Sequence, residues 1–172
     1  MQSATSVDVR PTWVGSNCQE TALPNFRLPV APADVGLTTC DRHQPDRAGR
    51  ARAWAPALAL GAESLGLPLG LVSRIDEQQY TVYASHCPDG SIKNGQQFRL
   101  GDTYCSVTLA NNDLFCIENA HCSDYAGHPC YQLRRLQAYI GVPLHVGGQL
   151  WGTVNFSSAD PYIQHFSAAD FE

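Results

Sequence analysis

Two strand pairs, each joined by a short connection, constrain the fold of this chain more than any other feature. The later pair spans residues 138–146 and 149–157, and the Gly-Gly dipeptide between them fits a two-residue turn with positive φ angles. The earlier pair spans 69–75 and 79–85, with three residues between its strands. Large apolar side chains occupy both faces of the last strand, so we expect layers on both sides of the sheet.

Helices and shorter strands are predicted for the rest of the chain from residue 53 onward. Trp54 and Leu58 lie on one helical face, and Pro56 places the start of that helix near residue 53 because proline fits the first turn. Asp102 is expected to cap a helix over 103–110. Strands at 96–100 and 114–117 and a helix of about two turns after Pro129 complete the order. This predicts an α/β (α+β) layered domain with a mostly antiparallel sheet of about five to six strands.

The last strand is expected to divide its side chains between the two faces of the sheet. Strict alternation places Trp151, Thr153, Asn155 and Ser157 on one face, and Leu150, Val154 and Phe156 on the other.

The first 52 residues differ in composition from the rest. They contain five prolines and no apolar period, which predicts an extended or disordered leader over 1–52 and a folded domain over 53–172. The domain holds five Lys and Arg against eleven acidic residues, a balance that argues against binding to nucleic acid. No stretch approaches the roughly 18 apolar residues of a membrane span, and no secretory signal begins the chain. We therefore expect a cytoplasmic protein without membrane contact, whose seven cysteines are reduced.

Two of the cysteines stand where helices are expected to begin. Cys105 follows Gly101-Asp-Thr-Tyr, and Cys130 ends the segment Gly127-His-Pro-Cys. The positive end of a helix dipole favours a thiolate there. We expect both thiols on one side of the sheet, facing one cavity, either as pocket-lining groups or as half-buried structural thiols.

Metal-binding residue types are also dense in this region. They are Cys116, His121, Cys122, His128 and Cys130. The segment lacks the paired Cys-x-x-Cys of structural zinc sites, so we predict no metal site and interpret Cys116 as a core residue.

Several segments resemble a GAF domain. The matching stretches are 65–75, 100–105 (Leu-Gly-Asp-Thr-Tyr-Cys), 138–144 (Ala-Tyr-Ile-Gly-Val-Pro-Leu), 152–156 (Gly-Thr-Val-Asn-Phe) and 166–170 (Phe-Ser-Ala-Ala-Asp). Gly-Asp-Thr-Tyr-Cys and His-Pro-Cys-Tyr resemble a narrower group of bacterial signalling modules with kinase or cyclic-di-GMP output domains. GAF domains usually end in a long helix after the last stretch. Because the sequence stops at Glu172, we expect that helix to be missing.

The enzyme alternative implied by the resemblance is a free methionine-(R)-sulfoxide reductase. Cys130 matches the loop of its attacking cysteine and Cys105 a second cysteine, and with Cys87 these thiols would supply attack and resolution. The reductases hold their substrate with carboxylates on the last two strands, where this chain carries Tyr139, Asn155 and Ser157. We therefore lean against catalysis and expect the chain to be silent in that reaction.

The photoreceptor alternative is a GAF domain that attaches a bilin through a cysteine. The attachment cysteine is usually followed by His, whereas Cys130 is followed by Tyr131. The signature of cyclic-nucleotide-binding GAF domains is also missing.

The preferred interpretation is a sensory or regulatory GAF module of a bacterial signalling protein, which binds a small ligand or dimerises to control an output domain. The ligand and any cofactor stay unnamed, because GAF pockets share a fold and not a chemistry. Expected partners are that small molecule, a second copy of the chain, and a kinase or cyclic-di-GMP output domain in a longer relative. The candidate ligand-binding residues are Tyr104, Cys105, Asp124, His128, Cys130, Tyr139 and Asn155.

Overall fold

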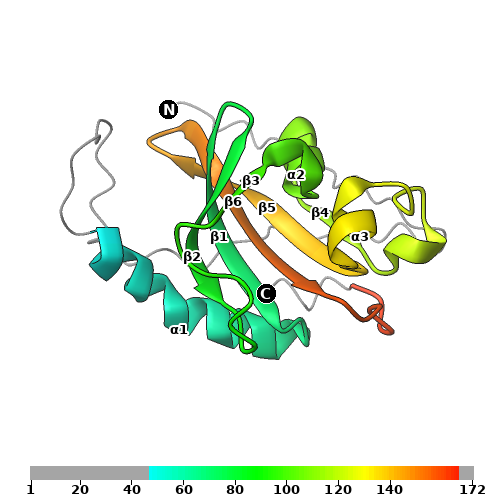
Figure 1. The fold of residues 1–172 in the computed structure, drawn as a ribbon. Helices are drawn as coiled ribbons and strands as arrows, with labels where there is room; N and C mark the ends of the chain where they lie inside the picture. The colour runs from blue at the N-terminus through cyan, green and yellow to red at the C-terminus, as the bar shows by residue number, and fades with distance from the viewer. Residues whose placement is uncertain (1–46, 167–172) are drawn as a thin grey trace, which may run out of the picture.

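The computed structural model describes residues 47–166 as an open six-stranded sheet with helices on both faces (Figure 1). The strands are β1 (Leu69–Asp76), β2 (Gln79–His86), β3 (Gln97–Arg99), β4 (Phe115–Ile117), β5 (Ala138–Val146) and β6 (Gln149–Ser158). The helices are α1 (Arg47–Leu65), α2 (Cys105–Asn111) and α3 (Pro129–Arg134), with 3₁₀ turns η1 (Leu100–Asp102) and η2 (Ala120–Cys122). The spatial order is β3-β2-β1-β6-β5-β4, and every neighbouring pair is antiparallel. The predicted fold class is confirmed.

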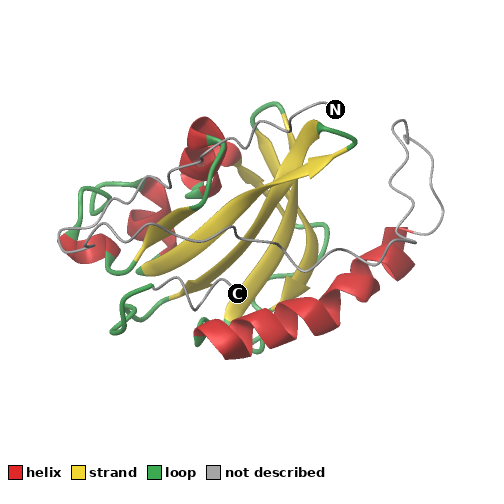
Figure 2. Cartoon of the chain, turned by 180° about the vertical axis from the view of Figure 1, so that it is seen from behind, coloured by secondary structure: helices red, strands yellow, loops and turns green. Residues whose placement is uncertain are grey.

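Each predicted hairpin forms, and the two hairpins meet in the middle of the sheet through β1 and β6. The β5–β6 turn uses Gly147 and Gly148 at φ angles of 59° and 78°, a backbone conformation that favours glycine. The helix α1 lies along one face of the sheet, whereas α2 and α3 lie on the other (Figures 1 and 2). Layers therefore cover both faces, as the sequence predicts.

Two β-bulges change which side chains face α1. The β5–β6 register shifts between Leu144 and His145, which leaves Trp151 as an extra residue on β6. A similar shift in the β1–β2 pairing leaves Tyr83 as an extra residue on β2. Both aromatics then pack on the α1 side, edge to face, with ring centroids 5.1 Å apart. The prediction that Trp151 shares a face with Thr153 is wrong, because a bulge interrupts the alternation of side chains.

The helix α1 begins earlier than predicted. It starts at Arg47 and continues through Pro56, which lies inside the helix and not in its first turn. Ala51 and Leu58 are buried in the cluster beneath the helix. This packing before and after Pro56 offsets the loss of the backbone hydrogen bond that proline cannot donate. The helix ends where the sequence predicts, before Gly66 at a φ of 64°.

The start of α2 also differs from its prediction. Asp102 closes the 3₁₀ turn η1 and does not cap the helix, because the N-cap position belongs to Tyr104 and no side chain caps it. The Thr103 hydroxyl donates to the Leu100 carbonyl at 2.8 Å and so holds the chain in the tight turn before α2. Cys105 still lies in the first turn of the helix.

Two predictions fall largely outside the described residues. Of the leader predicted over 1–52, residues 1–46 are outside the described part of the chain. The segment after Phe166, which bears on the prediction that the C-terminal helix is missing, is outside it as well. Within the described part of the chain, no helix has the length and apolarity needed to cross a membrane.

Candidate functional site

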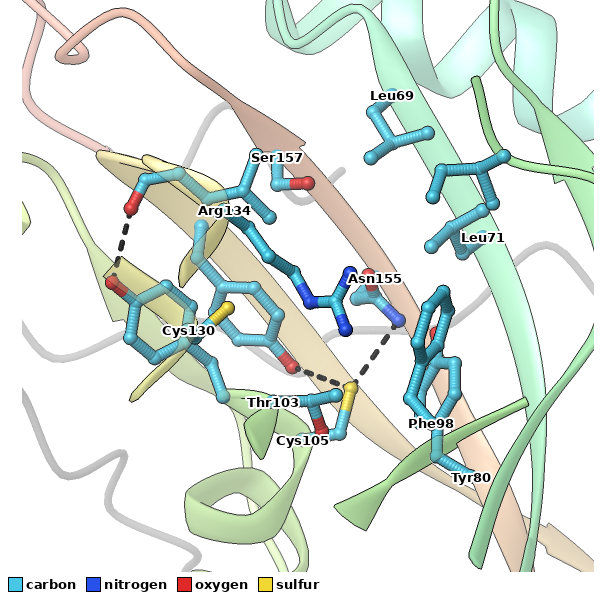
Figure 3. A pocket seen from close by; sticks show the side chains of 14 residues that line it. Leu69, Leu71, Tyr80, Phe98, Thr103, Cys105, Cys130, Arg134, Asn155 and Ser157 are labelled. Atoms are coloured by element: carbon cyan, nitrogen blue, oxygen red, sulfur yellow. Dashed lines mark hydrogen bonds between the residues drawn. The ribbon is translucent and has the colours of Figure 1, made fainter. Parts of the chain in front are cut away.

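A cavity lies between the sheet and the layer formed by α2 and α3 (Figure 3). Its wall comes from five strands of the sheet, from the helices α2 and α3 opposite, and from segments that connect them. The lining residues are Leu69, Leu71, Tyr80, Ile92, Phe98, Thr103, Tyr104, Cys105, Cys130, Arg134, Leu136, Tyr139, Asn155 and Ser157. The volume of about 50 Å³ is well below the roughly 300–1,000 Å³ of pockets for drug-sized ligands. As it stands, this cavity takes only a very small molecule.

The thiol of Cys105 is surrounded by hydroxyl and amide groups from the two strands of the later hairpin, β5 and β6. Tyr139 Oη donates to its Sγ at 3.4 Å, Thr153 Oγ1 at 3.2 Å and Asn155 Nδ2 at 3.5 Å. Figure 3 shows the interaction between Asn155 and Cys105 at the base of the pocket. The first helical turn of α2 positions this thiol over the sheet.

A second set of hydrogen bonds ties these groups to the rest of the domain. Thr153 Oγ1 lies 2.7 Å from Ser73 Oγ on β1, and Tyr139 Oη lies 2.7 Å from Thr108 Oγ1 on α2. All four side chains are buried. Buried polar groups with satisfied hydrogen bonds give the floor of the cavity a defined geometry.

Both cavity thiols are protonated at neutral pH. Burial raises the pKa of Cys130 to about 12, well beyond the opposing effect of a backbone N–H and of Arg134. Burial also raises the pKa of Cys105, although hydrogen bonds from Thr153 and Tyr139 oppose it. The expectation that the helix dipole favours thiolates at these positions is therefore wrong, because desolvation of the charged form outweighs the dipole. Both thiols are therefore in the less nucleophilic form at neutral pH.

One arginine, Arg134, reaches into the cavity from the last turn of α3. Figure 3 shows its guanidinium in the middle of the pocket, directed towards Asn155. Its Cζ lies 4.0 Å from the ring centroid of Phe98, a cation–π contact. Its Nε–H is buried and has no hydrogen-bond partner among the residues that the structure describes. Cys130 and Arg134 are four residues apart, which places them on one face of the short helix.

The structure brings five of the seven predicted ligand-binding residues to the cavity. They are Tyr104, Cys105, Cys130, Tyr139 and Asn155. His128 instead accepts a hydrogen bond from the Cys130 N–H at 3.1 Å as the N-cap of α3, and its ring lies tilted against that of Tyr104, with centroids 4.9 Å apart. Asp124 is exposed and is not part of the cavity wall.

The three cysteines of the enzyme alternative are not assembled. Cys105 and Cys130 line the cavity, on one side of the sheet as expected. Cys87 lies after β2, outside that wall, where its thiol donates to Asp89 Oδ1 at 2.9 Å. Cys116 is a buried core residue on β4. Among residues 47–166, no three His, Cys, Asp or Glu side chains gather closely enough to hold a metal ion.

Sequence reasoning missed Arg134 and the aromatic wall made by Tyr80 and Phe98. The spacing of Arg134 from Cys130 is a usable signal, because residues four apart share a helical face. No comparable signal marks Phe98. It comes from a three-residue edge strand, and only the pairing of β3 with β2 brings it to the pocket.

Solved structures share this fold at low sequence identity. A type II free methionine-R-sulfoxide reductase from Thermoplasma acidophilum is 18% identical, with a TM-score of 0.56 over 73% of this chain and 84% of its own. The GAF domain of an Acinetobacter phosphoenolpyruvate-protein phosphotransferase is 16% identical, with a TM-score of 0.55 over 70% and 71%. The blue-light absorbing form of the Thermosynechococcus elongatus PixJ GAF domain is 15% identical, with a TM-score of 0.57 over 74% and 80%.

These likenesses establish the fold, and the family follows from the sequence. No curated protein sequence matches the chain. The GAF domain family model matches residues 50–172, which is more than half of the chain. The chain therefore belongs to the GAF domain family, whose members are small-ligand-binding and regulatory modules.

Proposed function

We propose that this chain is the sensory module of a bacterial signalling protein, and that a small ligand in the cavity under α2 and α3 controls an output domain. The observation that carries the proposal is the cavity itself. It has one wall from the sheet and one from two short helices, and it holds the buried Nε–H of Arg134, which has no partner among the described residues. A ligand there would contact both layers at once.

Contact with both layers offers a route from binding to regulation. The helices α2 and α3 have seven and six residues, too short to be stable without tertiary contacts. A ligand that bridges them to β5 and β6 would stabilise one placement of these helices over others. A ligand shifts a conformational equilibrium only by such differential contact.

Native mass spectrometry of the purified 172-residue chain, before and after denaturation, tests the proposal. We expect a small molecule that is bound in the native spectrum and released on denaturation, or one that binds when a mixture of metabolites is added. The same spectrum reports a dimer. A native mass equal to that of the chain alone, unchanged by such a mixture, would contradict ligand sensing.

The thiol-enzyme alternative receives less support from the site. Both cavity thiols are protonated at neutral pH, and no carboxylate lines the described cavity to hold an ammonium group. A thioredoxin-coupled assay on free methionine sulfoxide, with Cys130→Ser as the control variant, decides the matter. Turnover by the wild-type chain that the variant lacks would favour the enzyme over the sensor.

A further inference from the structure

We propose that the ligand of this cavity is a small organic acid and that Arg134 binds its carboxylate. The proposal rests on the proposed function and deepens it by naming the chemical class of the ligand. Arginine holds its charge at any physiological pH, and its planar fork matches a carboxylate with two parallel hydrogen bonds. In this pocket the Nε–H side of that fork is buried and has no partner in the described chain.

The charge of the cavity favours an anion. Arg134 is the only lining residue, among those described, with a formal charge at neutral pH, because the wall contains no Asp, Glu, Lys or His. The contact between His165 and Glu118, the one ion pair among the described residues, lies outside the cavity wall. Leaving a buried donor of a charged group unpaired is costly, and an incoming carboxylate removes that cost.

The remainder of the wall favours an acid with a short apolar part. Leu69, Leu71 and Leu136 line the pocket beside the arginine, and Figure 3 shows the first two across the cavity from the guanidinium. A phosphate presents several oxygens that each need a donor, and these leucines supply none. A monocarboxylate needs donors at one end only. The cavity volume of about 50 Å³ limits the remainder of the ligand to a few carbon atoms.

The Arg134 guanidinium is already oriented for this role. Phe98 covers one face at 4.0 Å, and Figure 3 shows the guanidinium extending into the pocket. Asn155 and Ser157 on β6 lie on the same wall and can reach a second carboxylate oxygen or an α-substituent. Arg134 does not serve as the charge partner of a Cys130 thiolate, because the Cys130 thiol is protonated at neutral pH.

The test uses the full chain and simple probes at constant ionic strength. Sodium acetate, propionate and butyrate are titrated beside acetamide, propionamide and butyramide, which have nearly the same shape without the charge. The readouts are the melting temperature and the NMR resonance of the Arg134 Nε–H. We expect at least one acid to raise the melting temperature and move that resonance, and its matched amide to do neither.

Variants separate recognition from structure. Arg134→Gln should weaken binding of the responding acid at least about tenfold, because a hydrogen bond to a charged group is lost. It should leave the melting temperature of the ligand-free chain unchanged or higher, since it removes a buried unpaired donor. Arg134→Lys should bind with intermediate affinity, because it keeps the charge without the planar fork. Arg135→Gln removes the same charge from the exposed neighbouring residue and should bind like the wild type.

The other outcomes overturn the proposal in distinguishable ways. Equal responses to acids and amides would show a neutral pocket, which contradicts the carboxylate and leaves ligand sensing intact. Saturation by inorganic phosphate in place of the acids would contradict the organic acid. Acid binding without movement of the Arg134 Nε–H, or with equal affinity in Arg134→Gln, would place the anion elsewhere. No response to any acid would exclude the inference, and native mass spectrometry would then judge the proposed function separately.

Discussion

The two faces of the sheet contain the same strands and have opposite characters. Towards α1 the buried cluster is mainly aliphatic, with Leu58, Val72 and Val154 among its members beside the core thiol of Cys116. Towards α2 and α3 the buried residues include thiols, tyrosines and hydroxyl groups, together with an arginine Nε–H that has no partner among residues 47–166. The first face resembles an ordinary protein core, whereas the second accommodates a cavity.

The strand β6 shows how one segment builds both faces. Val154 is packed beneath α1, and its neighbours Thr153 and Asn155 hydrogen-bond to Cys105 on the opposite side. Alternation of side chains along a strand thus separates stability from recognition within three consecutive residues. Substitutions on the α1 side should therefore change stability most, and substitutions on the other side should change binding.

The largest expected effect is on the α1 face. Leu58 is 1% exposed, so Leu58→Ala should lower the free energy of unfolding by about 2–5 kcal/mol through lost burial and a cavity. Urea denaturation followed by circular dichroism measures the loss. Leu60→Ala, on the same helix but 66% exposed, should change stability by less than about 0.5 kcal/mol. Similar losses in the two variants would show that α1 does not seal this face.

A smaller effect is expected in the hydrogen-bonded floor of the cavity. Thr153→Val should cost about 1–3 kcal/mol, because it leaves the buried Ser73 hydroxyl without its 2.7 Å partner and removes a donor to Cys105. Combining it with Ser73→Ala should recover part of the loss, since both members of the pair are then apolar. Thr81→Val, at a half-buried position on β2, is the matched control. A double variant that is less stable than Thr153→Val alone would contradict a pairwise role.

The smallest effect is the pH dependence of stability that arises from the thiols on the α2 and α3 side of the sheet. The pKa of Cys130 rises in the fold to about 12, so above its ordinary pKa of about 9 the unfolded chain releases a proton that the folded chain keeps. Stability due to this group is complete below pH 9 and falls as pH rises towards 12, by about 1.4 kcal/mol per pH unit.

Urea denaturation between pH 9 and 10 measures that slope. Cys130→Ala should reduce it by the contribution of one proton, and Cys105→Ala should also reduce it because burial raises that pKa as well. An unaltered slope in Cys130→Ala would mean that this thiol is open to water and not part of a buried wall.

Much of the fold was predictable because it depends on local signals. Alternating apolar residues and a Gly-Gly turn define the β5–β6 hairpin, and the segment ending at Gly66 behaves as a helix terminus. The helical position of Pro56 was not predictable, since its acceptance depends on the burial of Ala51 and Leu58 against distant strands. Tertiary packing here overrides a local propensity.

The candidate site also has features that local sequence predicts and features that depend on tertiary packing. Cys105 and Cys130 at the starts of short helices could be placed on one cavity from their segments alone, as could Tyr139 and Asn155 on the final hairpin. The protonation of the thiols could not, because it depends on how many atoms from remote segments exclude water from the sulfur.

The sequence by itself determined the antiparallel hairpins, the two covered faces and the family, because side-chain alternation and turn residues act within a few positions of each other. Only the tertiary structure decided that Tyr83 and Trp151 pack together beneath the sheet and that the cavity thiols are protonated. It also decided that Arg134 enters the pocket with an Nε–H that no described residue pairs. Each of these depends on register, burial or a missing partner between segments far apart in the chain, and no local pattern contains that information.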